Sequence, residues 1–128
     1  MKQIEPISIK DIEAIEKKFN LTLPCIYKQQ ILSLNGKTFA YAYISHPVLG
    51  ELDFSRFISL SPKDKYSIYD IFNKVIKDKK YFPFADTDFG DYYCFDLTDE
   101  KVVFWSHETD SIHKICDSFS DFLNLINS

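Results

Sequence analysis

The strongest constraint on the fold is a series of three short aromatic and aliphatic runs, separated by polar stretches. The runs occupy residues 82–85, 92–97 and 102–105, and the polar stretches occupy residues 86–91 and 98–101. Alternate side chains of a strand share a face, so Tyr93, Phe95 and Leu97 would line one face, which residues of the third run can cover. The pattern predicts three antiparallel strands joined by two polar loops.

Apolar residues recur at helical spacing in four other segments, which we expect to be amphipathic helices. These segments are residues 9–19, 24–34, 66–78 and 119–127. Pro24 suits the first turn of the second helix, and Asn35 with Gly36 supplies a left-handed stop at its end. Cap signals mark the first and last helices, in the pairs Ser8 with Asp11 and Ser118 with Asp121.

Residues 38–60 are rich in Phe, Tyr, Ile, Leu and Val and are interrupted by two turn signals, which predicts two or three further strands. Helices at both ends and in the middle, with strands between them, predict an α+β domain. We expect an antiparallel sheet of about five to six strands, with the N-terminal, middle and C-terminal helices on one side. A length of 128 residues fits one domain spanning residues 1–128.

Cysteine usage and hydropathy indicate a cytoplasmic protein. Cys25, Cys94 and Cys116 are odd in number and form no C-x-x-C pair, so we expect reduced thiols and no disulfide framework. No apolar run approaches the roughly 20 residues that span a bilayer, and the first residues lack a signal peptide's hydrophobic region. The chain has only three glycines, which excludes a glycine-rich phosphate loop. Because the sequence has neither a bilayer-length apolar run nor a signal peptide's hydrophobic region, we expect no contact with membranes.

Charge is unevenly distributed along the chain. Residues 1–83 carry 13 basic and 9 acidic side chains, whereas residues 84–128 carry 2 basic and 10 acidic ones. An acidic C-terminal part favours attraction to a basic partner and argues against nucleic-acid binding by that part. The alternative interpretation is a solvated surface that keeps the protein soluble, and composition does not decide between the two.

Several pieces of the chain, taken in order, resemble the signature of the SUKH superfamily, which includes Smi/Knr-type fungal regulators and many bacterial immunity proteins. The pieces are Leu23-Pro24, Leu34-Asn35-Gly36, Pro83-Phe84-Ala85-Asp86 continuing through Gly90-Asp91 to Tyr93, Phe95 and Asp96, and Ser118-Phe119 with Phe122-Leu123. They extend over almost the whole chain. Lys37 and Phe89 depart from the pattern where glycine is common, which affects local turn geometry.

The resemblance implies a binding protein that is not an enzyme and uses no cofactor. Bacterial members are expected to act as immunity proteins, each of which neutralises a polymorphic toxin, often a nuclease, by covering part of its surface. We therefore expect a cognate protein toxin as the partner, and a monomeric chain that binds neither nucleic acid nor membrane. An alternative is a regulatory scaffold of the Smi/Knr type. A small hydrolase that uses clustered carboxylates as general acid and base is less favoured.

The acidic residues around the predicted strands are the candidate partner-binding site, since carboxylates speed association with a cationic surface. They are Asp86, Asp88, Asp91, Asp96, Asp99 and Glu100. For Asp86, Gly90 and Asp91 a structural role is favoured, because Asp and Gly commonly fix turns through hydrogen bonds and a positive φ. Structural roles are also expected for the remaining motif residues, which are Pro24, Asn35, Gly36, Pro83 and Trp105.

Other kinds of site receive little support. The sequence from Asp86 to Asp91 lacks the ligand spacing and the final bidentate Glu of a calcium loop. His113 and Cys116 have no evident set of further ligands for zinc, so no metal site is expected. Cys94 lies in an aromatic run, where a thiol most often fills the core and does not act as a nucleophile.

Overall fold

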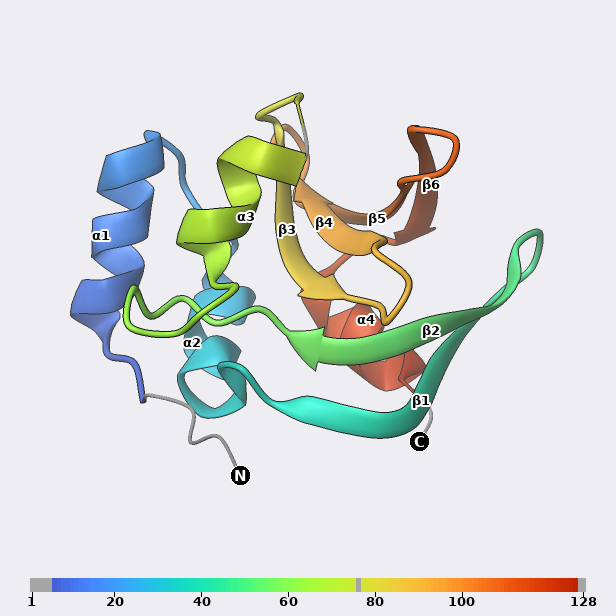
Figure 1. Cartoon of the computed structure of the whole chain (residues 1–128), viewed down its shortest axis with the longest axis horizontal. Helices are drawn as coiled ribbons and strands as arrows, with labels where there is room; N and C mark the ends of the chain where they lie inside the picture. Colours follow the sequence, from blue (N-terminus) through green and yellow to red (C-terminus); the bar gives the residue numbers. More distant parts are fainter. Residues whose placement is uncertain (1–5, 76, 127–128) are drawn as a thin grey trace.

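The strands form one antiparallel meander, in which each strand pairs with its neighbours in sequence (Figure 1). The computed structural model describes residues 6–75 and 77–126, and this part contains four helices and six strands. In chain order they are α1 (Ile9–Phe19), α2 (Cys25–Leu34), β1 (Thr38–His46), β2 (Gly50–Phe57), α3 (Ile68–Val75), β3 (Tyr81–Asp86), β4 (Tyr92–Asp96), β5 (Lys101–Ser106), β6 (Ser111–Cys116) and α4 (Phe119–Leu125). This is the α+β arrangement that the sequence predicts.

One aromatic core joins the helices to the sheet. Tyr27 of α2 lies at its centre, and its ring contacts rings of β3, β4 and α4. Phe84 of β3 and Phe95 of β4 stack with centroids 4.3 Å apart. All four helices contribute buried side chains to this core, namely Ile12, Ile15, Tyr27, Ile31, Ile68, Ile71, Phe72, Phe119 and Phe122.

A second, smaller cluster lies apart from the main core. Cys94 of β4 packs there with Val103 and Trp105 of β5. Cys94 is adjacent to Tyr93 and Phe95, which belong to the main core, so the two clusters lie on opposite faces of the sheet. The helices therefore pack on one face, as predicted, and Trp105 packs on the other. Its indole Nε1–H donates to the Asp110 carboxylate at 2.8 Å.

The β1–β2 hairpin diverges from the rest of the sheet. β2 pairs with β3 only at its C-terminal end, where Arg56 lies opposite Asp86 and Phe57 opposite Ala85. The other end of the hairpin extends beyond the sheet (Figure 1). There, Nε2 of His46 lies 3.0 Å from the carbonyl oxygen of Lys114 in β6. The first and last strands thus approach each other, and the sheet curls around the space between them.

Most predicted boundaries agree with the structure, with two corrections. The predicted third helix at 66–78 is shorter: α3 begins at Ile68, because Tyr66 has a left-handed φ of 57°, and residues 77–80 lie outside it. Residue 76 and residue 127 of the predicted helices fall outside the described part. Residues 38–60 form two strands, the lower of the two predicted numbers, and the sixth strand is β6, at a segment for which no strand was predicted.

The predicted end of α2 at Asn35 and Gly36 is confirmed, and the Asn35 side chain also bonds a distant segment of the chain. Gly36 has a φ of 69°, a conformation that glycine adopts without strain. The Asn35 side chain accepts a hydrogen bond from the Leu60 N–H at 2.7 Å and donates one to the Ser59 hydroxyl at 3.1 Å. Asn35 therefore connects the end of α2 to the segment that follows β2.

Pro24 and Pro83 both lie at irregular positions of the backbone. Pro24 precedes α2 as its cap residue, one position earlier than the predicted first turn. Pro83 is buried in β3, beside a register irregularity between Pro83 and Ala85. Among the described helices, none combines the length and the apolar character that crossing a membrane requires.

Candidate functional site

The structure divides the six predicted acidic residues into two groups at opposite ends of β4. Asp86, Asp88 and Asp91 lie at the β3–β4 turn, before Tyr92 begins the strand. Asp96 ends the strand, and Asp99 and Glu100 follow it in the β4–β5 loop. A strand of five residues rises roughly 3.4 Å per residue, so the two groups are more than one ion-pair distance apart.

Asp86 is mostly buried and pairs with Arg56. The Arg56 Nε–H donates to Asp86 Oδ2 at 2.9 Å, across the short contact between β2 and β3. The second carboxylate oxygen, Oδ1, is buried and has no hydrogen-bond partner among the described residues. Burial raises the pKa of Asp86, and the hydrogen bond and charge of Arg56 only partly oppose this rise. Asp86 has the geometry of a strand-pairing residue, in line with its favoured structural role.

Asp88 is exposed at the turn, where it is linked to β2. Its carboxylate accepts a hydrogen bond from the Ser55 hydroxyl at 2.9 Å. Its backbone N–H donates to the carboxylate of Asp53 at 2.7 Å. The Asp53 carbonyl in turn accepts from the Tyr93 hydroxyl at 2.7 Å. These bonds fix the position of the β1–β2 hairpin relative to the β3–β4 turn.

The turn itself is organised by Thr87, and Asp91 is directed elsewhere. The Thr87 hydroxyl accepts from the backbone N–H groups of Phe89 and Asp91, at 3.1 and 3.2 Å. Gly90 has the predicted positive φ, 89°. The Asp91 carboxylate instead contacts His107, with Oδ1 3.0 Å from its backbone nitrogen and 2.7 Å from Nδ1. The expectation that aspartates fix this turn is corrected: Thr87 does so, and Asp91 holds the β5–β6 loop.

In the second acidic group, the Asp96 side chain forms its hydrogen bonds within the β4–β5 loop. Asp96 Oδ1 accepts from the Thr98 N–H at 3.0 Å and from the Thr98 hydroxyl at 2.6 Å. Burial acts to raise the pKa of Asp96, but the two bonds from Thr98 outweigh it and lower the pKa. Asp99 and Glu100 are exposed in the same loop, so they are accessible to a partner.

A groove of about 740 Å³ lies between the β1–β2 hairpin, the β3–β4 turn and the β5–β6 hairpin. Its apolar lining includes Leu49, Leu52 and Phe104. Four carboxylates line it, and no Lys or Arg is among its lining residues. These carboxylates belong to Glu51, Asp53, Asp91 and Glu108. The groove therefore combines an apolar surface with a strongly negative potential.

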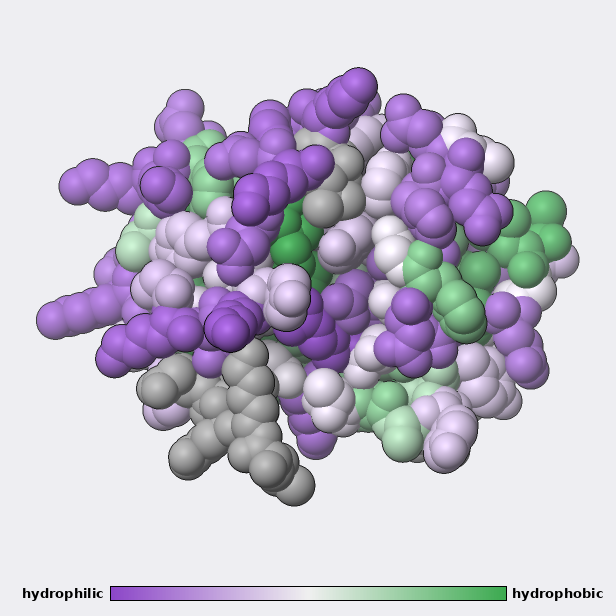
Figure 2. Space-filling model, in the orientation of Figure 1, coloured by the Kyte–Doolittle hydropathy of each residue, from purple (hydrophilic) through white to green (hydrophobic). Residues whose placement is uncertain are grey.

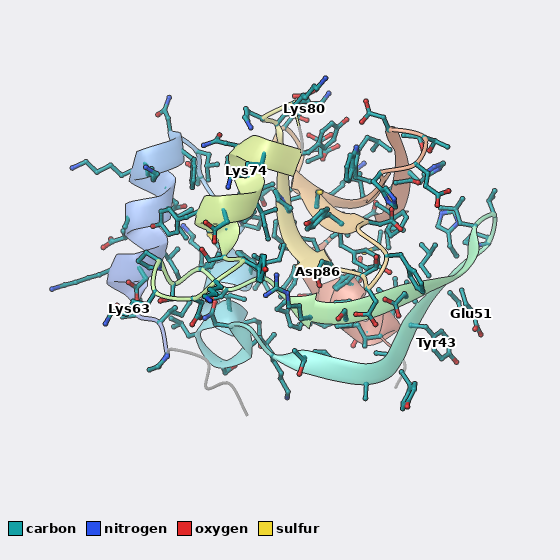
Figure 3. The ribbon with its side chains drawn as sticks, viewed as in Figure 1. Tyr43, Glu51, Lys63, Lys74, Lys80 and Asp86 are labelled. Carbon is teal, nitrogen blue, oxygen red and sulfur yellow. The ribbon has the colours of Figure 1, made fainter. Side chains whose placement is uncertain are left out.

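Two of the four groove carboxylates are unengaged. Within residues 6–75 and 77–126, no hydrogen bond or ion pair reaches the side chain of Glu51 or Glu108, and both residues are exposed. Asp53 and Asp91, in contrast, are held in place by the Asp88 N–H and by His107. Figure 3 shows Glu51 on the β1–β2 hairpin, at the far end of the view from Lys63, Lys74 and Lys80.

Exposed apolar side chains border the same groove. Phe89, at the tip of the β3–β4 turn, is 70% exposed, and Val48, at the tip of the β1–β2 hairpin, is 83% exposed. Figure 2 shows hydrophobic surface at the end of the molecule where this hairpin turns. Apolar side chains next to free carboxylates are typical of a surface that binds another protein.

The groove contains residues that the sequence did not indicate as a site. Glu51 and Asp53 come from β2, far in sequence from the predicted acidic cluster, and Glu108 comes from the β5–β6 loop, eight residues after Glu100. The curl of the sheet brings the two β2 residues next to Asp91. The predicted hairpin turn near residues 46–50 was the available signal, but it does not specify which way the hairpin bends.

Neither a reactive thiolate at Cys94 nor a cluster of metal ligands is found in the described residues. Burial raises the pKa of the Cys94 thiol well above its usual value, so the reactive thiolate is disfavoured there. No three His, Cys, Asp or Glu side chains within the described part are grouped as ligands of a metal ion. Cys25, Cys94 and Cys116 are free thiols.

Comparison with known proteins identifies one family. A family model described as SMI1 / KNR4 family (SUKH-1) matches residues 6–125, which is nearly the whole chain. No curated protein and no solved structure matches.

Proposed function

The chain belongs to the SMI1/KNR4 family (SUKH-1), and on this basis we propose that it is an immunity protein for a toxin with a basic surface. It binds the toxin through the acidic groove and the adjoining β3–β4 turn, and it blocks the toxin by covering its surface, without catalysis. The observation that carries the proposal is the groove with four carboxylates and no Lys or Arg in its lining.

The charge of the groove favours fast capture of a cationic protein. A concave surface lined by one sign of charge focuses the electrostatic field and raises the rate of association with an oppositely charged partner. The lysines labelled in Figure 3 lie near α1 and α3, away from Glu51. This separation of positive and negative charge orients the molecule so that the groove faces an approaching basic surface. An immunity protein benefits, because it must bind its toxin before the toxin reaches its target.

The apolar border of the groove supplies the second component of such an interface. A stable protein interface buries about 800 Å² on each partner, and most of its binding energy comes from a few central side chains. Phe89 and Val48 are exposed apolar side chains beside the carboxylates, and Thr87 and Gly90 fix the turn that carries Phe89. We propose Phe89 as an apolar contact and Asp88 as a contact at the edge of the interface.

The product of the neighbouring gene is the first candidate toxin, and it provides the direct test. The two proteins are co-expressed, and cell survival and co-purification are measured. We expect the unchanged chain to restore growth and to co-purify with the toxin domain. The double variant Glu51→Gln/Glu108→Gln should protect less well, because it removes the two unengaged groove carboxylates.

The control for that variant is Asp99→Asn/Glu100→Gln, which removes the same charge at the other end of β4. The contacts of Asp96, Asp99 and Glu100 with a partner stay a prediction, and this comparison tests the contacts of Asp99 and Glu100. Equal loss of protection in both double variants would place the interface outside the groove. A chain that neither protects nor co-purifies with the toxin, but is recovered with a host protein, would favour the regulatory scaffold.

A further inference from the structure

We infer that the partner inserts a short arginine-bearing loop into the groove, rather than resting only on its rim. This inference rests on the proposed function and specifies the chemistry of the partner's contact segment. Three features support it: the size and lining of the groove, the arrangement of its carboxylates, and the hydrogen bonds that attach its walls.

The size of the groove fits a few side chains from a loop. Its volume of about 740 Å³ lies within the roughly 300–1,000 Å³ of sites that enclose a ligand. Its walls come from three different hairpins or turns, so an inserted segment would be contacted from several directions. A partner that rested only on the rim would leave the half-buried side chains of Leu49 and Leu52 in contact with water, at a cost in affinity.

The lining matches arginine better than lysine. The aliphatic part of a long cationic side chain can pack on Leu52 and Phe89 while its charged end reaches the carboxylates. Guanidinium binds carboxylate through two parallel hydrogen bonds, stacks on aromatic rings, and is more weakly hydrated than ammonium. Glu51 and Glu108, which have no partner within the described part of the chain, are the carboxylates open to such binding.

The groove is held open before any partner binds. The Asp88 N–H to Asp53 bond fixes the β2 wall, and the Asp91 to His107 contacts fix the β5–β6 loop. His46 joins the hairpin to β6 through the Lys114 carbonyl. Because these walls are already ordered, insertion loses less conformational entropy than it would in a mobile site.

A variant whose groove is filled by a bulky side chain distinguishes insertion into the groove from docking on its rim. Ser106 lines the groove from β5 and makes no hydrogen bond through its side chain to another described residue. Ser106→Trp places an indole in the groove and changes no charge, and Ser106→Ala leaves the groove open. Ser45→Trp adds the same indole on β1, at an exposed residue that does not line the groove.

The probe is a disulfide-closed peptide hairpin with three arginines in its turn, together with the same hairpin carrying glutamines. Binding is followed by amide chemical shifts in two-dimensional NMR spectra of the full chain, which also show that each variant is folded. We expect the arginine hairpin to shift resonances of groove residues and the glutamine hairpin to shift none. Ser106→Trp should weaken binding at least about tenfold, Ser106→Ala should weaken it far less, and Ser45→Trp, outside the groove, should leave it unchanged.

Three results would overturn the inference. The first is equal binding of the arginine hairpin to the chain and to Ser106→Trp. The second is no binding of the hairpin, and the third is shifts spread equally over the groove and the Asp99–Glu100 loop. All three leave the survival test of the proposed function unaffected: a chain that protects cells but fails here binds its toxin by the rim or by another face. A chain that binds the hairpin in the groove but gives no protection retains the site and loses the toxin partner.

Discussion

At the scale of single residues, two buried tyrosine hydroxyls have opposite surroundings. Tyr27 is fully buried at the centre of the core, and its hydroxyl has no hydrogen-bond partner among the described residues. Tyr93 is also buried, but its hydroxyl donates to the Asp53 carbonyl at 2.7 Å. An unsatisfied buried polar group costs about 1–3 kcal/mol, whereas a satisfied one contributes about 1 kcal/mol.

We therefore expect Tyr27→Phe to raise the free energy of unfolding by about 1 kcal/mol and Tyr93→Phe to lower it by about 1 kcal/mol. Urea denaturation of the two variants and the unchanged chain measures both values. The two substitutions remove the same atom from buried rings, so each is the control for the other. Equal destabilisation by both would show that the Tyr27 hydroxyl has a partner in solution.

The Asp86 carboxylate gives a prediction about pH. Burial raises its pKa in the folded state above the ordinary value of about 3.9, so the folded chain holds this proton more tightly than the unfolded chain. The contribution of Asp86 to stability is therefore present below the ordinary pKa and lost as pH rises through the raised pKa. The stability of the unchanged chain minus that of Asp86→Asn should fall across this window, as measured by urea denaturation at a series of pH values.

Asp96 provides a control of opposite sign. Its pKa is lowered in the folded state, since the Thr98 hydrogen bonds outweigh burial. Its stabilising contribution is lost as pH falls through the lowered pKa, so the difference between the unchanged chain and Asp96→Asn should grow as pH rises toward about 3.9. The same sign for both aspartates would contradict the assigned environments.

At the scale of elements, Asn35 connects α2 to the segment between β2 and α3. Its side chain bonds the Leu60 N–H and the Ser59 hydroxyl, both of buried residues. Asn35→Ala leaves these groups without that partner, so we expect a loss of about 1–3 kcal/mol in the free energy of unfolding. Ser33→Ala, at an exposed position of α2, is the control and should change stability by less than about 0.5 kcal/mol. Similar thermal midpoints for both variants would show that the Asn35 hydrogen bonds do not stabilise the fold.

The sequence predicted elements well where local signals were strong. α1 has the predicted bounds, and the Asp11 carboxylate accepts from the Ser8 N–H at 2.8 Å, as the cap signal indicated. The helix α3 was predicted too long, since apolar spacing continues past the point where the chain leaves the helix. β6 was not predicted separately, because its residues are only half-buried or exposed and carry no apolar alternation of their own.

At the scale of the whole molecule, the sheet's curl decides where charge collects. The sequence shows an acidic C-terminal part, and Asp86, Asp88, Asp91 and Gly90 were recognised from it. It does not show that β2 leaves β3 after two paired positions, or that His46 reaches β6. Those long-range contacts add Glu51 and Asp53 to the acidic end, beside Asp91 and Glu108. A site built by such contacts has no local pattern, so sequence reasoning found one wall of the groove and not the other.

The central claim is that the groove captures a basic protein, and the rate of association with the cognate toxin domain at several ionic strengths tests it most directly. We expect the rate for the unchanged chain to fall as salt rises, because screening extends only about 8 Å at 0.15 M. Glu51→Gln/Glu108→Gln should bind more slowly at low salt and depend less on salt, whereas Asp99→Asn/Glu100→Gln should resemble the unchanged chain. An association rate that does not change with salt, or that changes equally in both double variants, would contradict the account.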